Sequence, residues 1–183
     1  MRETAFIGFG SNVGDRADFC DRAVTLLSLL PQSQVQGVSL LYETEPVRDV
    51  ADPGDGWFLN GVIQLVTDVS ARSLMTVLRE IERSLGRDEE RRSGPRTMDL
   101  DLLFYGHRVI DEPGLTVPHP RLHLRRFVLQ PLSELDPSWM HPSLGRSISQ
   151  LLTEVADRSQ VRRLSPQPST RYGSRPVCSP SLS

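Results

Sequence analysis

The sequence predicts an α+β fold: a ferredoxin-like, split β-α-β-β-α-β antiparallel sheet with both helices on one face, plus a C-terminal helical extension. Strand-type and helix-type hydrophobic patterns alternate in this order over roughly the first hundred residues. A length of 183 residues with 38% hydrophobic side chains suits one compact domain. We therefore expect a single domain over residues 1–164 and a disordered Ser/Pro/Arg-rich tail over residues 165–183.

The first part of the chain supplies three of the expected strands. An apolar run over residues 4–9 predicts a strand that ends in the turn-like segment GFGSNVG. A helix is expected over residues 15–30, where apolar residues recur at helical spacing before Pro31 stops the pattern. Two more strands are expected over residues 35–44 and 57–68, joined by a long loop of the kind that often carries function.

The second helix and the fourth strand follow. Ser70 can cap a helix with one apolar stripe, and Gly86 suits its C-terminal cap. The highly charged residues 87–96 are expected to form a mobile loop, and residues 97–105 form a strand pattern. Because both helices pack on one face of such a sheet, its other face is left for a ligand.

The sequence after residue 105 predicts one short strand and two helical segments. A turn at residues 106–107 is expected to lead into a short return strand over residues 108–111. Residues 118–135, interrupted by Pro131, and residues 147–155 have mostly helical patterns.

Composition excludes several classes of protein. All 21 basic residues are arginine, so a Walker P-loop, a protein-kinase fold and a Schiff-base enzyme, which each need a lysine, are excluded. A net charge of −2 gives no overall positive field for nucleic acid or anionic lipid. No apolar run is long enough to span a membrane and no secretion signal is evident, so we expect a cytoplasmic protein without a membrane partner. Cys20 and Cys178 form neither a disulfide framework nor a zinc motif.

Two carboxylates stand out on the fourth expected strand. In MDLDLLF, the apolar side chains point to one face, and Asp99 and Asp101 point to the other, with Cα atoms about 6.5–7 Å apart. Adjacent anions repel unless a cation neutralises them, and hard oxygen ligands suit magnesium. A solvated pair matched by arginine would explain the pattern without a metal, but we favour a metal site at Asp99 and Asp101.

Arginines crowd the approach to these carboxylates, interleaved with acidic residues. Ion pairs along a solvated helix explain part of this pattern. Guanidinium groups on a loop that face a metal-binding carboxylate pair are also what a polyphosphate needs, and this favours phosphoryl-group transfer. The arginines concerned are Arg79, Arg83, Arg87, Arg91, Arg92 and Arg96.

Five segments in this order resemble one family. GFGSN, YETEP, FLN, GPRTMDLDLL and LTVPHPRLHLRRFVLQPL together resemble 6-hydroxymethyl-7,8-dihydropterin pyrophosphokinase of folate biosynthesis. The resemblance covers residues 4–160, and the GPRxxDLD block is its most specific part. It implies transfer of pyrophosphate from ATP to 6-hydroxymethyl-7,8-dihydropterin, giving the pterin diphosphate and AMP.

The resemblance also implies roles for individual residues. Two Mg²⁺ ions would be held by Asp99 and Asp101, with Arg87 and Arg96 acting on the phosphates of ATP. The residues implied in nucleotide binding are Glu82, Arg87, Arg96, Thr116, His119 and Arg125, with Arg91 and Arg92 as further possible phosphate contacts. The residues implied in pterin binding are Thr44, Pro46, Val47, Phe58, Asn60, Asp99 and Phe127.

The chain departs from the family pattern at several places. Residues 88–90 are acidic where basic residues are usual, and Ser93 stands where tryptophan is common. Phe58 replaces a common tyrosine, and Gly114 replaces an arginine that touches the nucleotide in some members. We expect these departures to affect the rate of the reaction and not its type.

Two other functions compete with this assignment. A split βαβ sheet also serves RNA recognition, but the aromatic pattern of such domains is missing, and Asp99 and Asp101 would repel an RNA backbone. A metal-dependent nucleotidyl transferase or hydrolase would use the paired aspartates but would not need Asn60 and Phe127. We expect a monomer that binds small molecules and no nucleic acid.

Overall fold

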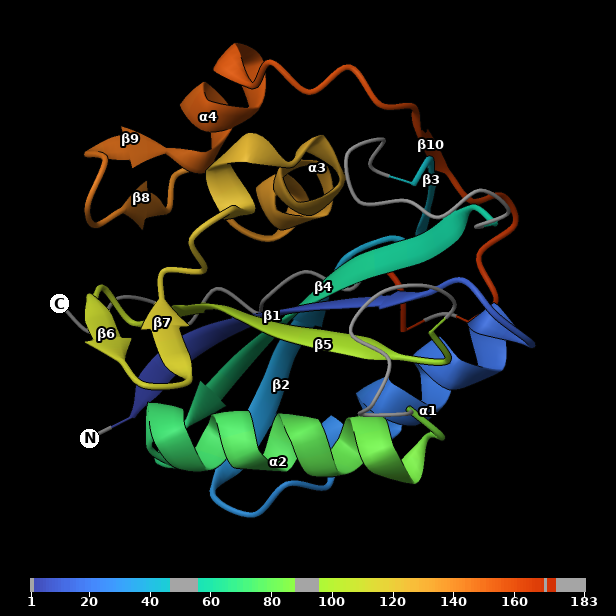
Figure 1. Ribbon diagram of the computed structural model, residues 1–183, viewed down its shortest axis with the longest axis horizontal. Coiled ribbons are helices and arrows are strands. Elements are labelled where there is room, and N and C mark those ends of the chain that lie inside the picture. Colours follow the sequence, from blue (N-terminus) through green and yellow to red (C-terminus); the bar gives the residue numbers. More distant parts are fainter. Residues whose placement is uncertain (1, 47–55, 88–95, 170, 174–183) are drawn as a thin grey trace, which may run out of the picture.

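The computed structural model describes residues 2–46, 56–87, 96–169 and 171–173, and its centre is an antiparallel sheet (Figure 1). Strand β1 (Glu3–Ser11) pairs with β4 (Phe58–Thr67) on one side and with β5 (Asp99–Tyr105) on the other. The strand order is β10-β3-β4-β1-β5, and β2 also pairs with β4. The sequence-based expectation of a mixed fold of helices and an antiparallel sheet is confirmed.

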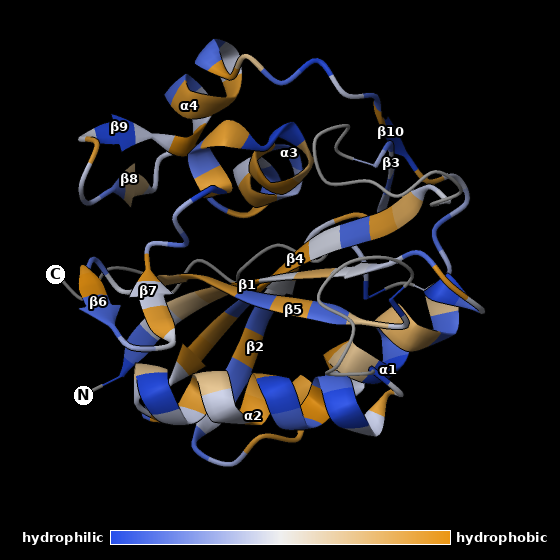
Figure 2. Cartoon of the chain, in the orientation of Figure 1, coloured by the Kyte–Doolittle hydropathy of each residue, from blue (hydrophilic) through white to orange (hydrophobic). Residues whose placement is uncertain are grey.

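Two helices cover one face of this sheet (Figure 1). Helix α1 (Arg16–Ser28) begins where the Asp15 carboxylate accepts from the Asp18 N–H, and α2 (Ala71–Ser84) begins where the Ser70 hydroxyl accepts from the Ser73 N–H. Figure 2 shows α2 banded in blue and orange along its length, as expected for a helix with one buried face. Among the described residues, no helix has the length and apolar character needed to cross a membrane.

The opposite face is partly covered, which corrects the expectation that it is left for a ligand. Helix α3 (Arg126–Leu135) and helix α4 (Ile148–Glu154) lie over it, after the short 3-10 helix η1 (Leu122–Leu124) (Figure 1). Their apolar residues form a second core with side chains of the sheet. Pro131 lies inside α3 and does not interrupt it, contrary to the sequence-based expectation.

The strand expected over residues 35–44 is two strands. Strand β2 (Ser33–Val38) contains a bulge, and β3 (Tyr42–Thr44) pairs with a different part of β4. Between the two strands, Ser39 donates its N–H to the Val62 carbonyl and its hydroxyl accepts from the Val62 N–H. This side chain replaces one ladder hydrogen bond, so the chain can turn without leaving the edge of β4.

Small hairpins fill the outer parts of the fold. The return strand expected over residues 108–111 begins later in the structure, as β6 (Ile110–Glu112), and it pairs with the strand that follows it, β7 (Leu115–Val117). A second hairpin joins β8 (Met140–His141) to β9 (Arg146–Ser147).

The C-terminal segment differs from the disordered tail expected from Ser165. Strand β10 (Val161–Arg163) pairs with β3, and the Gly173 N–H donates to the Val38 carbonyl. Tyr172 is only 5% exposed, packs into the core and donates its hydroxyl to Asp21 at 2.8 Å. Residues 165–169 and 171–173 are therefore part of the fold, while residues 174–183 lie outside the described residues.

Candidate active site

One pocket lies on the face of the sheet that carries α3, and β1 forms its floor. The strand register places Gly10 between Asn60 of β4 and Asp99 of β5, and Gly8 between Val62 and Asp101. The pocket has a volume of about 250 Å³ and is lined by Gly8, Phe9, Gly10, Thr44, Glu45, Pro46, Phe58, Asn60, Gly61, Val62, Arg87, Arg96, Asp99, Asp101, Leu103, His119, Arg121, Arg125, Phe127 and Val128. Sites for drug-sized ligands usually measure roughly 300–1,000 Å³. The pocket that the described residues enclose is therefore slightly smaller than this range.

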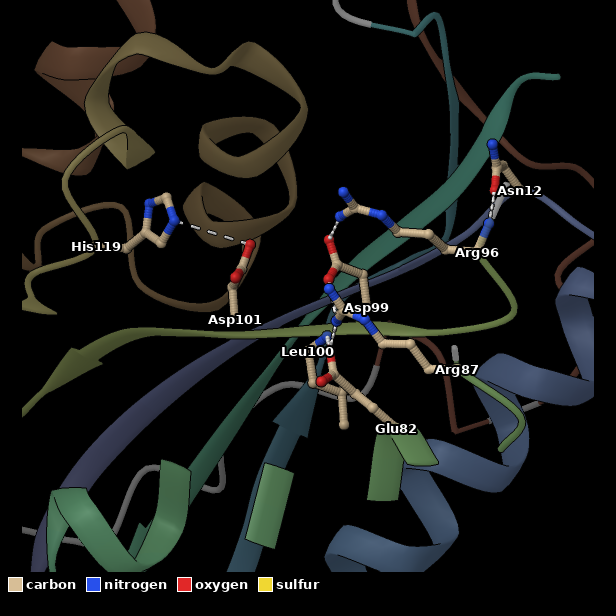
Figure 3. Close-up of polar contacts among 8 residues, drawn as sticks. All are labelled: Asn12, Glu82, Arg87, Arg96, Asp99, Leu100, Asp101 and His119. Carbon is tan, nitrogen blue, oxygen red and sulfur yellow. Dashed lines mark hydrogen bonds and ion pairs between the residues drawn. The ribbon is translucent and has the colours of Figure 1, made fainter. Parts of the chain in front are cut away.

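Asp99 lies between two guanidinium groups (Figure 3). Arg87 Nη1 contacts Asp99 Oδ1 at 2.6 Å, and Arg96 Nη1 contacts Asp99 Oδ2 at 2.8 Å. The backbone of Arg96 is in turn held by Asn12, which accepts from the Arg96 N–H through Oδ1 at 2.7 Å and donates its own N–H to the Arg96 carbonyl. The arrangement places two cations beside one carboxylate.

Glu82 lies behind Arg87, on the far side of β5 from the pocket. It is 6% exposed and accepts from both the Leu100 N–H, at 2.7 Å, and Arg87 Nη1 (Figure 3). Burial raises the pKa of Glu82 to about 7, although the Leu100 N–H and Arg87 oppose this shift. Although partial burial of Arg87 acts against its charge, the Asp99 and Glu82 carboxylates raise its pKa. Glu82 therefore supports the site from below instead of lining it.

Asp101 faces the pocket beside Asp99, as the alternation along the strand predicts. Its side chain is 39% exposed into the pocket, with Oδ2 4.0 Å from His119 Nε2. The surrounding pocket walls and then the Asp99 charge raise the pKa of Asp101. Burial, and then the charges of Arg125 and Arg121, lower the pKa of His119 to about 4. His119 is therefore neutral at neutral pH, and its Nδ1 accepts from the Arg121 N–H at 3.2 Å.

The segment that contains η1 and leads into α3 brings a second pair of arginines to the pocket. Arg121 and Arg125 both line it, and Arg125 lies over the Phe127 ring, 5.5 Å from its centroid. Burial and then the neighbouring Arg121 lower the pKa of Arg125. A positive region that is partly withdrawn from water favours an anionic ligand.

The opposite end of the pocket is less charged. Asn60 is 7% exposed, and its Nδ2 donates to Thr44 Oγ1 at 2.6 Å. Thr44 pairs with Phe58 across β3 and β4, and Phe58 and Phe127 both line the pocket. Arg16 links β3 to the residue just before β4, because it donates to Glu43 and to the Trp57 carbonyl. An amide and two aromatic rings suit a flat polar heterocycle.

The structure brings most of the sequence-predicted site residues together. Thr44, Pro46, Phe58, Asn60, Arg87, Arg96, Asp99, Asp101, His119, Arg125 and Phe127 all line the pocket. Glu82 does not, and Thr116 lies exposed on β7, where its hydroxyl donates to Asp111 at 3.4 Å. Val47, Arg91 and Arg92 lie outside the described residues.

Sequence reasoning missed several pocket residues. Arg121 stands in the VPHPR segment, and its charge two residues after His119 could have marked it. Gly8 and Gly10 stand in the GFGSN segment and alternate along a strand, which is the signal for a shared face. Glu45 carried no comparable signal.

The donor set fits magnesium bound together with a polyphosphate. Asp99 and Asp101 supply hard oxygen ligands from one face of β5. The described residues contain no group of three or more His, Cys, Asp or Glu side chains that could hold a metal ion by themselves. Magnesium usually keeps waters and shares its coordination between one or two carboxylates and substrate phosphates, so two carboxylates suffice.

Comparison with known proteins agrees with this geometry. The family model for 7,8-dihydro-6-hydroxymethylpterin-pyrophosphokinase matches residues 6–137. A 2-amino-4-hydroxy-6-hydroxymethyldihydropteridine pyrophosphokinase of Bacillus subtilis (strain 168) is 42% identical over 137 residues, covering 74% of this chain and 79% of the relative. One of the same name from Synechocystis sp. is 36% identical over 151 residues, covering 82% of this chain and 75% of the relative.

Solved structures are similar in fold. A crystal structure of Plasmodium falciparum HPPK-DHPS, wild type with SDX-DHP, superposes with a TM-score of 0.68 at 15% identity. The match covers 84% of this chain and 44% of the solved chain, so the chain spans less than half the length of that protein. From the family model and the identity to the two curated relatives, we conclude that the chain belongs to the 7,8-dihydro-6-hydroxymethylpterin-pyrophosphokinase family.

Proposed function

We propose that this chain transfers pyrophosphate from ATP to 6-hydroxymethyl-7,8-dihydropterin, giving the pterin diphosphate and AMP, in folate biosynthesis. The observation that carries the proposal is the strand register of the pocket floor. It puts Asp99 and Asp101, the proposed metal ligands, one strand away from β1 with Gly10 and two strands away from Asn60. Donor and acceptor chemistry therefore share one pocket.

In the reaction, the hydroxymethyl oxygen of the pterin attacks the β-phosphorus of ATP. The bond between this phosphorus and the oxygen bridging to the α-phosphorus breaks, AMP leaves with that oxygen, and the pterin hydroxyl gives its proton to solvent. Asp99 and Asp101 would hold Mg²⁺, which supplies charge neutralisation between phosphate oxygens when bound. The chain's own residues align the two substrates and screen their charge.

Arg87 and Arg96 fit the role of phosphate ligands that change partner. Both guanidinium groups contact Asp99 in this structure, at 2.6 Å and 2.8 Å. If Asp99 held a metal cation, the two arginines would no longer be needed to neutralise that carboxylate and would be free to turn to phosphate oxygens.

His119, Arg121 and Arg125 form the opposite wall of the phosphate site. Because His119 has a lowered pKa and is neutral, it can donate one hydrogen bond to a phosphate oxygen without adding a full charge. Arg121 and Arg125, which flank η1, supply cationic charge. Positive groups on two walls suit a triphosphate that spans the pocket.

The acceptor end is assigned to the pterin. Asn60 offers an amide, Thr44 fixes that amide, and Phe58 and Phe127 offer aromatic faces. Pro46 completes the described wall, and Val47 is retained as a proposed contact although it lies outside the described residues. A nucleotidyl transferase or hydrolase would not require this set of groups.

Several finer properties belong to the same proposal. We assign two Mg²⁺ ions, a nucleotide contact for Thr116, a position for Glu82 behind Arg87 at the nucleotide site, a cytoplasmic location, and a monomer without nucleic-acid or membrane partners. We also assign one catalytic domain over residues 1–164, against which residues 165–169 and 171–173 pack. The strand order is consistent with a ferredoxin-like sheet extended by C-terminal helices.

The test is AMP release from ATP and magnesium with and without 6-hydroxymethyl-7,8-dihydropterin, followed by mass spectrometry of the pterin. Pterin-dependent AMP together with a diphosphorylated pterin supports the proposal. Release of ADP would mean transfer of a single phosphoryl group and would overturn it. Absence of any product from folded protein would overturn it as well.

A further inference from the structure

The floor of the pocket has no side chain at Gly10, between Asn60 at one end and Asp99 at the other. Gly10 of β1 pairs with Asn60 on one side and with Asp99 on the other. Directly opposed residues in an antiparallel sheet have Cβ atoms about 4.5–5.5 Å apart, so a side chain at this position would stand between the phosphate end and the acceptor end.

The space above Gly10 is occupied by the Asn60 amide. A Cβ built on Gly10 would lie 2.2 Å from Asn60 Oδ1 and 3.3 Å from Asn60 Cγ. Both distances are shorter than ordinary van der Waals contacts, which are about 3.5–4.0 Å. Gly10 is not among the glycines with positive φ, so its backbone would accept alanine and only the space forbids it.

The Asn60 amide cannot move aside freely. Its Nδ2 donates to Thr44 Oγ1 at 2.6 Å, and Thr44 is 1% exposed in β3. Rotation of the amide away from a new methyl group would break this hydrogen bond inside the fold, where water does not replace it readily.

We propose that Gly10 is a positioning residue for the acceptor substrate: its missing side chain lets the Asn60 amide lie across β1, with Nδ2 held by Thr44 and Oδ1 turned over the strand as an acceptor. This rests on the proposed function, because the acceptor is taken to be the pterin. The residue acts through Asn60 and not by touching the nucleotide. Its effect therefore falls on acceptor binding and not on ATP binding.

Gly8 offers a matched comparison on the same strand and the same face. A Cβ on Gly8 would lie 3.4 Å from the terminal methyl groups of Leu103 and would not meet Asn60. Gly8→Ala therefore adds the same methyl group to the same strand without the same clash.

The experiment is a double-mutant cycle on the full chain. Gly10→Ala, Asn60→Ala and the double variant are compared, with Gly8→Ala in both backgrounds. For Gly10→Ala we expect the KM for the pterin to rise roughly tenfold, with the KM for ATP changed less than about twofold. In the Asn60→Ala background, Gly10→Ala should change neither the pterin KM nor the Tm further, because the clashing amide is gone. The Tm change caused by Gly8→Ala should be the same in both backgrounds.

Each outcome decides the question. If Gly10→Ala has the same effect with and without the Asn60 side chain, the proposal is wrong. If Gly10→Ala does not fold, the double variant must fold as well as Asn60→Ala, and its failure would also overturn the proposal. If the unsubstituted protein makes no pterin-dependent AMP, the proposed function fails, and the Tm cycle still tests the contact between Gly10 and Asn60.

Discussion

Glu82→Ala should lower the free energy of unfolding, because Glu82 holds the backbone of β5. Glu82 Oε1 accepts both the Leu100 N–H and Arg87 Nη1, and Leu100 stands between Asp99 and Asp101. Alanine leaves the buried Leu100 N–H without an acceptor, which costs about 1–3 kcal/mol. We expect the free energy of unfolding to fall by about 2 kcal/mol and the Tm by roughly 4–8 °C for a chain of this length.

Glu82→Gln separates the hydrogen bonds from the charge. The glutamine Oε1 can accept from both donors, so this variant should lose less than about 1 kcal/mol at pH 6. Burial raises the Glu82 pKa from 4.5 to about 7. Between these two values the folded protein binds more protons than the unfolded chain, so the contribution of Glu82 to stability falls as pH rises through this window. The full interval corresponds to about 3 kcal/mol, a contribution that the glutamine variant lacks.

Urea denaturation of the three proteins at half-unit steps from pH 4.5 to 8 measures this directly. The stability of Glu82→Gln relative to the unsubstituted protein should increase as pH rises, while groups that titrate in both proteins cancel in the difference. If the difference in stability does not change with pH, the conclusion that burial raises the pKa of Glu82 is wrong. A loss of less than about 0.5 kcal/mol in Glu82→Ala would refute its structural role.

Three further predictions concern the carboxylate pair, the C-terminal segment and the histidine. Asp101→Asn should abolish pterin-dependent AMP release while the Tm stays equal or rises, because it removes a proposed metal ligand and a carboxylate whose pKa is raised. Asp111→Asn, at an exposed position on β6, should change neither, and an active Asp101→Asn would contradict the metal assignment. Removal of residues after 164 deletes the buried Tyr172 ring and should lower the free energy of unfolding by about 2–4 kcal/mol. Turnover should be retained below the new Tm. An unchanged urea midpoint would show that this ring contributes nothing to stability. The His119 pKa is lowered to about 4, so the unfolded chain binds more protons between pH 4 and 6.5, and stability falls as pH falls through that window. His119→Gln should lose less stability than the unsubstituted protein between pH 7 and 5 in the same urea assay, and equal losses would contradict this.

The sequence predicted best those features that depend on local periodicity. The helix after Ser70 follows from spacing alone. So does the shared orientation of Asp99 and Asp101, which point to the sheet face opposite the apolar side chains between them, and the structure shows both features. The buried position of Glu82 also follows from the helical period. Glu82 stands four residues after Leu78 and three before Leu85, both of which are buried, so the helical period places it on the buried face of α2.

Long-range contacts could not be predicted in the same way. The division of residues 35–44 into β2 and β3 depends on Ser39 and its partner on β4. The C-terminal segment has no hydrophobic period, and one buried residue, Tyr172, together with backbone hydrogen bonds, holds it in place. A single anchoring side chain leaves no repeating pattern, so composition alone pointed to disorder.

The pairing of β10 with β3 has a consequence for the order in which the molecule is assembled. Thr44, a neighbour of the Asn60 amide, pairs with Val161, which follows it by more than a hundred positions in the chain. During synthesis, β1, β3, β4 and β5 can associate well before β10 has been made, because domains form from the N-terminal side as the chain emerges. The edge of the acceptor site would then be the last part of the sheet to be closed. A nascent chain could hold both carboxylates in place while its acceptor end is still open, so that binding competence for the two substrates would be acquired at different times.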